Sequence, residues 1–412
     1  MKASLNIKND MLINGLYIFG MLLYSLSMFI PPLRVGVVLS SYLVIGIIIA
    51  IKGRTIRVNG IIDVLVICYL FYNVLAIIIS IFNGFPYSVP IREFANSTLP
   101  IVLFFIGNNT KDSSKFYYNV LIASIFCIII GIVLYIWVPL FYREYLLRIR
   151  VVGGTDPIYA RERMCSIIGS TSVGTFSVYG LILSLKQLID NKDKKKLVSC
   201  GICLVGIIMS YQRSAYLVAF CILLLAHYLC FFKWNILKKG WLLFEAVLFF
   251  SMMLLVYKMY PSLFYSVFNR ILSFKDAFGD RTGQWLNTIE NTRNIAFGSG
   301  LGSVGHTALG YSEFLITDGG LIKIFCEIGI IGFALFSLII LLSIIKCLFS
   351  FKEHYIELAI ILTVLLQSLG SNTIAFMMEA IVFWYAVGAI NYKQYKGVKY
   401  NENYLYVSSP VS

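Results

Sequence analysis

Apolar runs recur along this chain of 412 residues, each separated from the next by a polar connector. A helix needs about 20 apolar residues to cross the roughly 30 Å hydrocarbon core of a membrane. With 59% hydrophobic and 13% charged residues, the chain has a mean hydropathy of +0.83. The sequence therefore predicts an all-α polytopic membrane protein with about twelve transmembrane helices. The runs lie at approximately 11–31, 35–51, 61–82, 96–107, 117–140, 172–189, 197–210, 214–232, 241–257, 320–345, 356–369 and 374–391.

Basic clusters mark every second connector, and further lysines follow the last run. The clusters lie at 52–57, 111–115, 192–196, 233–239 and 346–352. Because connectors rich in Lys and Arg stay in the cytoplasm, both termini are expected there. Residues 1–392 then form a single transmembrane domain and residues 393–412 a cytoplasmic tail. Two long connectors, at about 141–171 and 258–319, face outward, and the second is a large outer loop between the ninth and tenth helices.

The arginines concentrate on the outer side of this threading. Eleven of the thirteen fall there: Arg34, Arg92, Arg143, Arg148, Arg150, Arg161, Arg163, Arg213, Arg270, Arg281 and Arg293. The orientation of a protein in the membrane depends only on an excess of positive charge on the inner side. The arginines on the outer side therefore need another explanation. A guanidinium binds phosphate and carboxylate oxygens in pairs, which an ammonium does not. The placement therefore indicates recognition of an anion such as pyrophosphate at the outer face.

The remaining composition excludes other classes of site. The net charge of +14 is explained by membrane topology, and no basic patch interleaved with aromatic residues indicates nucleic-acid binding. The nine cysteines and three histidines show no zinc-ligand spacing. Cys200 and Cys203 have CxxC spacing, but they lie inside an apolar run, where small buried hydrophobes are expected. We expect neither a metal nor a cofactor.

The first outer loop and a short hairpin are candidate anion sites. The loop has five arginines against three acidic residues, and among them Arg150, Arg161 and Arg163 are suited to a lipid-linked phosphate. Binding to anionic lipid headgroups is the alternative. Arg213 lies in a very short outer hairpin between two spans. An intramembrane charge needs a partner, although Arg213 can also extend to the headgroups.

The second outer loop has balanced charge, so any site in it must be local. Arg281 and Arg293 bracket a helix-compatible stretch at 284–292. A glycine cluster follows, GSGLGSVG at 298–305, whose spacing includes GxGxxG. No strand precedes it, so a dinucleotide fold is rejected. Gly300 and Gly302 either let backbone N–H groups approach an anion or form ordinary turns.

Four residues on the outer side are candidate proton acceptors: Asp318, Glu313, His306 and Glu379. Asp318 immediately precedes the tenth predicted helix, where it can instead cap the helix N-terminus. His306 can titrate near neutral pH and is also a candidate substrate ligand, but a lone loop histidine is often only a surface residue. Glu379 lies inside a predicted span, which makes it a functional candidate or a partner in an interhelical hydrogen bond.

Several of these segments resemble the O-antigen polymerase and ligase superfamily of bacterial envelope glycosyltransferases. The stretch FGSGLG at 297–302, followed by DGGLIKIFCEIGIIG at 318–332, is similar to a loop-and-helix signature of these enzymes. The hairpin SYQRSA at 210–215 resembles their short outer hairpin. Arg163 and Gly174 fit the RX10G spacing of the polymerases, whereas neither Arg281 nor Arg293 begins a second copy of that spacing.

The resemblance implies a GT-C-like fold and a function at the periplasmic face of the bacterial inner membrane. The donor would be a growing glycan on polyprenyl pyrophosphate, and the acceptor a lipid-linked repeat unit. Neither nucleotide nor metal would be needed, because the pyrophosphate already activates the sugar. Expected partners are these lipid-linked oligosaccharides, membrane lipids and a chain-length regulator protein. The implied catalytic residues are Asp318, Arg281 and Arg163; the implied substrate-binding residues are Arg213, Arg293, Arg150, Arg161, Gly300, Gly302, Gly174 and His306.

Two alternatives to a polymerase stay open. An O-antigen ligase transfers finished glycan to a lipid A core, and ligases usually carry a histidine nine residues before the signature glutamate. That glutamate is Glu327 here, and the residue nine positions before it is Asp318 and not a histidine. This difference favours a polymerase. A flippase or transporter of lipid-linked sugars is expected to place cations along a central cavity, whereas the charged residues of this chain avoid the centres of the predicted spans.

Overall fold

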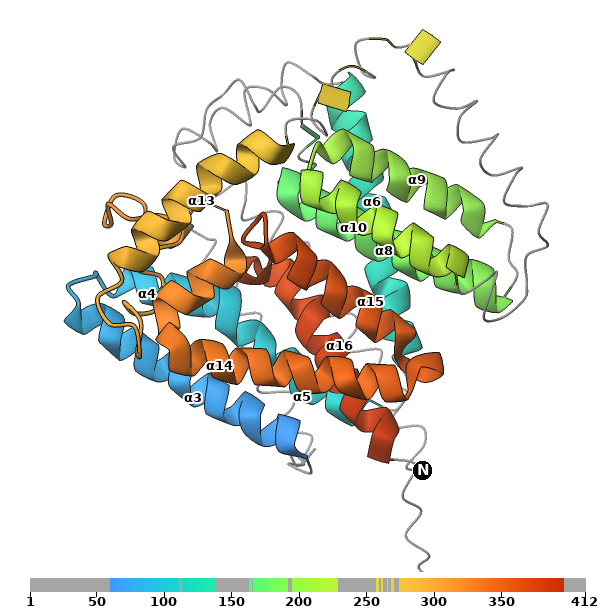
Figure 1. Ribbon diagram of the computed structural model, residues 1–412. Helices are drawn as coiled ribbons and strands as arrows, with labels where there is room; N and C mark the ends of the chain where they lie inside the picture. The colour runs from blue at the N-terminus through green and yellow to red at the C-terminus, as the bar shows by residue number, and fades with distance from the viewer. Residues whose placement is uncertain are drawn as a thin grey trace, which may run out of the picture.

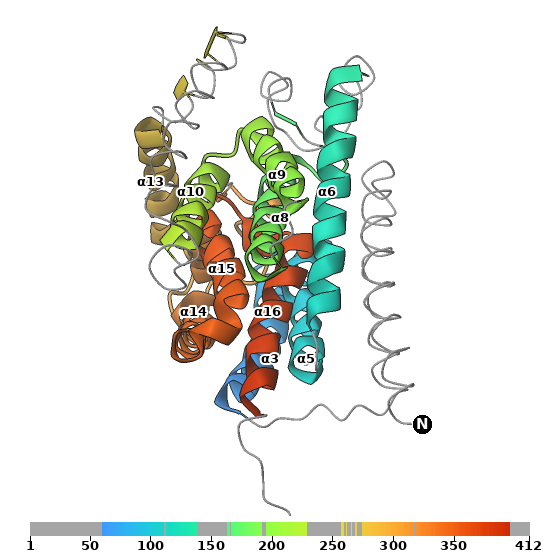
Figure 2. The same cartoon turned by 90° about the vertical axis from the view of Figure 1, so that its right-hand side faces the viewer.

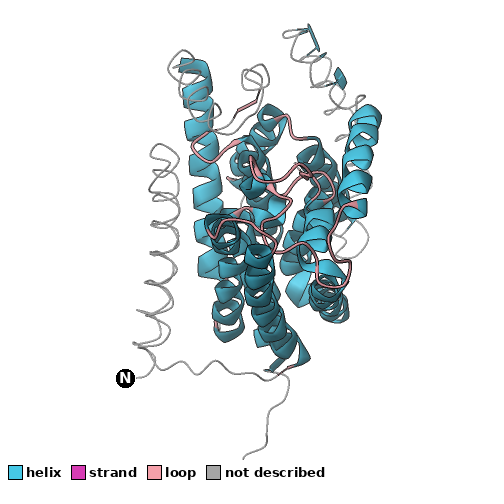
Figure 3. Ribbon diagram, turned by 90° about the vertical axis from the view of Figure 1, so that its left-hand side faces the viewer, coloured by secondary structure: helices cyan, strands magenta, loops and turns pink. Residues whose placement is uncertain are grey.

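The computed structural model describes residues 60–110, 113–137, 163–164, 166–191, 195–228, 274–316 and 318–395, together with single residues between 257 and 269. In that part of the chain every regular element is a helix and no strand is found (Figure 3). The predicted all-α class is therefore confirmed for the described residues.

The helices follow the apolar runs of the sequence. Nine of the predicted spans fall wholly or mostly in the described residues, and each coincides with helix. The helices are α3 (Ile61–Phe82), α4 (Ser88–Glu93), α5 (Val102–Asn109), α6 (Ser114–Trp137), α8 (Ser170–Asn191), α9 (Lys196–Ser210), α10 (Arg213–Tyr228), α13 (Phe274–Glu290), α14 (Gly320–Phe349), α15 (Phe351–Ser368) and α16 (Met377–Tyr395). The runs at 11–31 and 35–51 lie outside the described residues, as does all of the run at 241–257 except its last residue, so the count of twelve and the placement of the termini stay predictions.

Within the described part of the chain, five helical segments are long and apolar enough to cross a membrane: 61–82, 88–109, 114–137, 171–189 and 320–349. Their outer surfaces expose large apolar side chains, among them Phe71 on α3, Trp137 on α6 and Leu341 on α14. Such surfaces are unfavourable in water and are suited to lipid contact. These are the features of a helical membrane protein.

The helices pack as a bundle. In Figure 2, α6, α8, α9, α15 and α16 stand roughly upright beside one another, with α6 on one flank of the described helices and α13 on the other. Helix α8 packs against α6, α9 and α15, while α16 packs against α5 and α15. Phe383, Trp384 and Tyr385 on α16 are almost completely buried, so this helix lies in the core.

The helical run before α5 is irregular for a clear reason. Pro100 has no N–H group, so an α-helical turn cannot be completed there. The chain instead passes through a π turn at Phe94–Thr98 and a 3-10 turn at Leu99–Ile101. The span predicted at 96–107 is thus the second part of a longer helical run, Ser88–Asn109.

Helix α14 is broken at Gly329, and a loop completes the hydrogen bonding of the broken turn. Gly329 has φ 66° and ψ −175°, a conformation adopted almost only by glycine. Before the break, the carbonyls of Cys326 and Glu327 each accept a loop N–H at 2.9 Å, from Ser299 and Gly300 respectively. After the break, the N–H of Ile330 donates to the loop carbonyl of Ile295 at 2.9 Å, and the N–H of Ile331 donates to that of Ala296 at 3.3 Å. Irregular backbone at membrane depth needs such protein partners, because lipid offers none.

The glycines of this loop allow it to fit between α14 and α3, which lie side by side (Figure 1). A Cβ atom on Gly298 would overlap the backbone of Glu327, and one on Gly300 would overlap the backbone of Ser80 on α3. The next residue, Leu301, donates its N–H to the carbonyl of Ala76 at 3.0 Å. The spacing of the glycine cluster is therefore explained by close backbone packing.

Substituting Gly329→Ala should lower the free energy of unfolding by about 2 kcal/mol or more, because alanine is strained at this φ and ψ and its Cβ would overlap the backbone of Ala296. Gly201→Ala in α9 is the matched control, since a Cβ there meets no atom within 4 Å and alanine favours helix by up to about 1 kcal/mol. Thermal unfolding of the two purified variants in detergent measures the difference. Equal melting temperatures would contradict the role assigned to Gly329.

Candidate functional site

Arg281 and Asp318, both predicted to be catalytic, form an ion pair. Helix α13 presents Arg281 and, one turn later, Trp285 to the residues just before α14. The Nη2 atom of Arg281 donates to Oδ2 of Asp318 at 2.6 Å, and Nε1 of Trp285 donates to the carbonyl of Asp318 at 2.6 Å. The Arg281 and Asp318 side chains are 27% and 38% exposed. The pair is thus firmly held but remains accessible.

Asp318 does not cap α14, which was the alternative role for this residue. The N-cap residue is Gly319, with φ 126° and no side-chain cap hydrogen bond. A side chain on Gly319 would collide with the indole of Trp285, whose Nε1 atom lies 2.6 Å from the position of a Cβ. The Asp318 carboxylate is therefore directed to Arg281 and not to the helix terminus.

The hairpin with Arg213 lies next to this ion pair. Helix α9 ends at Ser210, Tyr211 turns the chain with φ 50°, and α10 begins at Arg213. Gly370, just after α15, lies between the two groups: a Cβ built on it would be 3.3 Å from Nη1 of Arg281 and 4.0 Å from Cβ of Ser214. The ends of α9, α10 and α15 thus converge on the residues that precede α14.

Arg163 and Gly174, the two ends of the RX10G spacing, both flank the same hairpin. Met164, next to Arg163, donates its N–H to the carbonyl of Met209 at 2.8 Å. A Cβ on Gly174 would overlap Oε1 of Gln212. Gly174 therefore makes room for the Gln212 side chain, and its substrate-binding role stays a prediction. Arg150 and Arg161 lie outside the described residues.

Arg293 is placed away from the Arg281–Asp318 pair. Arg293 is exposed, and its Nη1 atom donates to Oδ1 of Asn83 at the end of α3, at 3.2 Å. At about 1.5 Å per residue, α13 extends roughly 14 Å from Arg281 to its end at Glu290, so Arg293 lies well beyond the pair. His306 is exposed at the start of a short 3-10 turn, His306–Ala308.

Gly300 and Gly302 lie between helices. The N–H of Gly300 donates to Glu327, and a Cβ on Gly302 would meet Cβ of Glu93 at 3.0 Å. The structure thus gives both glycines a packing role. Their binding of pyrophosphate stays a prediction, as does that of Arg293 and His306.

Buried polar side chains, most of which the sequence interpretation missed, surround the N-terminal part of α8. Thr175 donates to Oε1 of Gln367 on α15 at 2.6 Å, and the Tyr179 hydroxyl donates to the carbonyl of Glu379 on α16 at 3.3 Å. Gln367 and Glu379 are fully buried, and Gln212 is 8% exposed. Only Glu379 was singled out from the sequence. A glutamine inside an apolar run was an available signal for Gln367.

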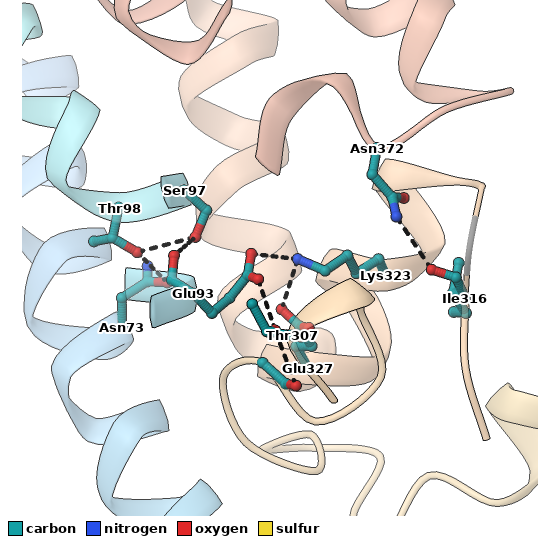
Figure 4. A network of polar contacts seen from close by, with 10 residues as sticks. Asn73, Glu93, Ser97, Thr98, Thr307, Ile316, Lys323, Glu327 and Asn372 are labelled. Carbon is teal, nitrogen blue, oxygen red and sulfur yellow. Dashed lines mark hydrogen bonds and ion pairs between the residues drawn. The ribbon is translucent and has the colours of Figure 1, made fainter. Parts of the chain in front are cut away.

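A second missed feature is a buried ion cluster of Glu93, Lys323 and Glu327 (Figure 4). Nζ of Lys323 contacts Oε1 of Glu93 and lies 3.3 Å from Oε2 of Glu327. Thr307 of the glycine loop donates to Oε2 of Glu93 at 3.0 Å. Each ionised side chain is only 3% exposed. The cluster ties α4, α14 and the loop together. Lys323 and Glu327, two charged residues inside the predicted run at 320–345, were an available signal for it.

Among the described residues, no three His, Cys, Asp or Glu side chains are grouped to hold a metal ion. The Asp318 carboxylate is instead held by Arg281, whose guanidinium is a group that can bind anions. The expectation of a metal-free and cofactor-free protein stays a prediction.

Replacing Lys323→Met should lower the free energy of unfolding by roughly 3–5 kcal/mol, because it leaves two buried carboxylates without their cation. The double variant Glu93→Gln with Lys323→Met removes one of these carboxylates and should be more stable than the single variant. Lys352→Met, at an exposed position on α15, is the control. The free energy of unfolding of each variant is measured in detergent by tryptophan fluorescence. If Lys323→Met lowers it by less than about 1 kcal/mol, the cluster contributes little to stability.

No protein-family model matches the chain, and no curated protein matches it. The resemblance to the O-antigen polymerase and ligase superfamily therefore rests on the motifs quoted from the sequence, and the function has to be inferred from the geometry of the outer helix ends.

Proposed function

We propose that the protein is a polysaccharide polymerase, making O-antigen or capsule, at the outer face of the bacterial inner membrane. It transfers a growing glycan from polyprenyl pyrophosphate to a lipid-linked repeat unit. The observation that carries the proposal is the guanidinium of Arg281, held by Asp318 beside the Arg213 hairpin. This places two arginines from distant parts of the chain at one convergence of helix ends.

Two arginines fit the charge that this reaction produces. The leaving pyrophosphate gains negative charge in the transition state, and donors aimed at that charge lower the barrier. A guanidinium carries five N–H donors. One of those of Arg281 holds Asp318, so a phosphate oxygen can bind the same group from its exposed side. Asp318 thereby fixes the orientation of Arg281 before the substrate arrives.

In the proposed step, the oxygen of an acceptor hydroxyl forms a bond to the anomeric carbon of the donor sugar. The bond from that carbon to the pyrophosphate oxygen breaks, and its electron pair leaves with polyprenyl pyrophosphate. The hydroxyl proton passes to a carboxylate, for which Asp318 is the accessible candidate next to Arg281. Arg163, whose neighbour Met164 contacts the end of α9, supplies further positive charge at the same corner.

A lipid-linked-sugar transporter is favoured by one observation, the charged side chains inside candidate spans. Lys323 and Glu327 lie in the segment 320–349 and Glu93 in the segment 88–109. All three lie nearer the start than the centre of their segments, so the expectation that charged residues avoid the span centres stays a prediction. Since the cation and the carboxylates of this cluster bind one another, they form a structural tie more readily than a pathway.

Arg281→Ala should reduce polymerisation by about 10²–10³-fold, because removing one donor to a developing anion has typically that effect. Arg281→Lys keeps the positive charge but lacks the paired N–H donors of the guanidinium, so its activity should lie between those of Arg281→Ala and the wild type. Surface glycan length, resolved on gels from cells lacking their own copy of the gene, is the measurement. Detergent-extracted protein of each variant should elute as wild type, to exclude misfolding.

Arg293→Ala is the matched arginine control, because Arg293 contacts Asn83 and not Asp318. A clearly smaller loss is expected for it than for Arg281→Ala. Long glycan chains from Arg281→Ala cells would contradict the proposal. Bare lipid A core with glycan left on its polyprenyl carrier would identify a ligase, and repeat units trapped on the inner leaflet would identify a flippase.

A further inference from the structure

Trp285 has no role in the step described above, although it contacts the same residue as Arg281. Its Nε1 atom donates to the backbone carbonyl of Asp318 at 2.6 Å, while the guanidinium of Arg281 donates to the Asp318 carboxylate at 2.6 Å. Arg281 and Trp285 are four residues apart on α13, so they project from the same face of that helix. Asp318 is therefore held at two points, its main chain by the indole and its side chain by the guanidinium.

The indole also packs directly on the backbone of the next residue, Gly319. A Cβ built on Gly319 would lie 2.6 Å from Nε1, 2.8 Å from Cε2 and 3.0 Å from Cζ2 of Trp285. Gly319 has φ 126°, a conformation that glycine adopts far more readily than other residues. The hydrogen bond and the packing of the indole thus fix two consecutive residues, Asp318 and Gly319.

The indole is itself anchored in the protein. Trp285 packs against a buried apolar cluster formed by Val304, Ile316 and Cys326. A tryptophan is a planar ring with only two side-chain torsions, whereas a long arginine side chain has many rotamers to lose on ordering. The indole therefore supplies a fixed reference, and the guanidinium of Arg281 is oriented relative to it through Asp318.

Asp318 has a competing position, which the indole hydrogen bond disfavours. The residue lies two positions before Gly320, the first residue of α14, and a helix N-terminus attracts a carboxylate. Fixing the main chain of Asp318 keeps its carboxylate on Arg281. We propose that Trp285 is a positioning residue, which acts through Asp318 to hold the Arg281 guanidinium in the orientation that binds the leaving pyrophosphate. The inference rests on the proposed function, because it concerns the same guanidinium.

The test measures binding of inorganic pyrophosphate to the full-length protein in nanodiscs by calorimetry. Trp285→Phe keeps an aromatic ring and removes the N–H donor. Gly319→Ala is the second variant, because its Cβ displaces the indole without changing it. Trp137→Phe is the matched control, since Trp137 is exposed at the end of α6. Trp285→Phe is also made in the Arg281→Lys protein, which keeps the positive charge that makes binding measurable.

We expect Trp285→Phe to weaken pyrophosphate binding about three- to tenfold, the usual effect of losing one hydrogen bond, and Gly319→Ala to weaken it at least as much. In the Arg281→Lys protein, Trp285→Phe should change binding by less than about twofold, because an ammonium is a point charge without a preferred plane. Trp137→Phe should bind pyrophosphate as the wild type does.

A spectroscopic measurement on the wild-type protein reports on the same coupling. Pyrophosphate should shift the indole N–H resonance of Trp285 in NMR spectra of protein with isotope-labelled tryptophan, because the indole and the guanidinium share Asp318. The resonance of Trp137 should not move. The Trp285 resonance is identified by its absence from Trp285→Phe and by its displacement in Gly319→Ala.

Two outcomes would overturn the inference. In the first, Trp285→Phe and Gly319→Ala bind pyrophosphate as tightly as the wild type. In the second, Trp285→Phe weakens binding equally in the wild-type and Arg281→Lys proteins, as expected if it only loosens the fold. Failure of the proposed function looks different, since Arg281→Ala then leaves both pyrophosphate binding and glycan length unchanged.

Discussion

The hydrogen bonds between the broken turn of α14 and the loop at 295–300 are the constraint on which the outer part of this structure depends. Without the loop, the carbonyls of Cys326 and Glu327 and the N–H groups after Gly329 would be unpaired inside an apolar bundle. The loop can reach them only because glycine occupies positions 298 and 300, where the loop backbone lies against the backbones of α14 and α3. The break in turn makes the first nine residues of α14 a separate half-helix, which carries Asp318 at its start.

The ion cluster is a second set of contacts that holds this half-helix in position. Lys323 and Glu327 lie on it, one turn apart, while Glu93 comes from α4 and Thr307 from the loop. A buried charge is tolerated only when its partners are in place, so these three segments hold one arrangement together. Asp318 lies two residues before the start of the same half-helix, and Arg281 binds it. The orientation of that guanidinium is therefore determined by contacts deep in the bundle as well as by its own neighbours.

The sequence predicts the helices well, because a membrane requires long apolar runs and an apolar run at that length has few alternatives to helix. It also indicates Arg281, Asp318 and the Arg213 hairpin as neighbours on one side of the bundle. It does not reveal which charges pair: Glu93 and Lys323 are 230 residues apart, and only the packing of α4 against the loop brings them together. The glycine cluster shows the same limit. The GxGxxG spacing is expected both where a backbone approaches a ligand and where it packs closely on a helix, and the sequence alone does not distinguish the two.

The distribution of polar groups at the outer helix ends separates two kinds of chemistry within a short stretch of structure. Arg281 and Arg213 remain partly exposed, whereas the side chains of Gln212, Gln367 and Glu379 are buried. The exposed guanidiniums attract anions, whereas the buried side chains carry hydrogen-bond donors and acceptors. The positive charge is therefore concentrated on the exposed side of these helix ends. This polarity requires no additional residue, because Gly370 and Gly174 already bring both groups to the same helix ends.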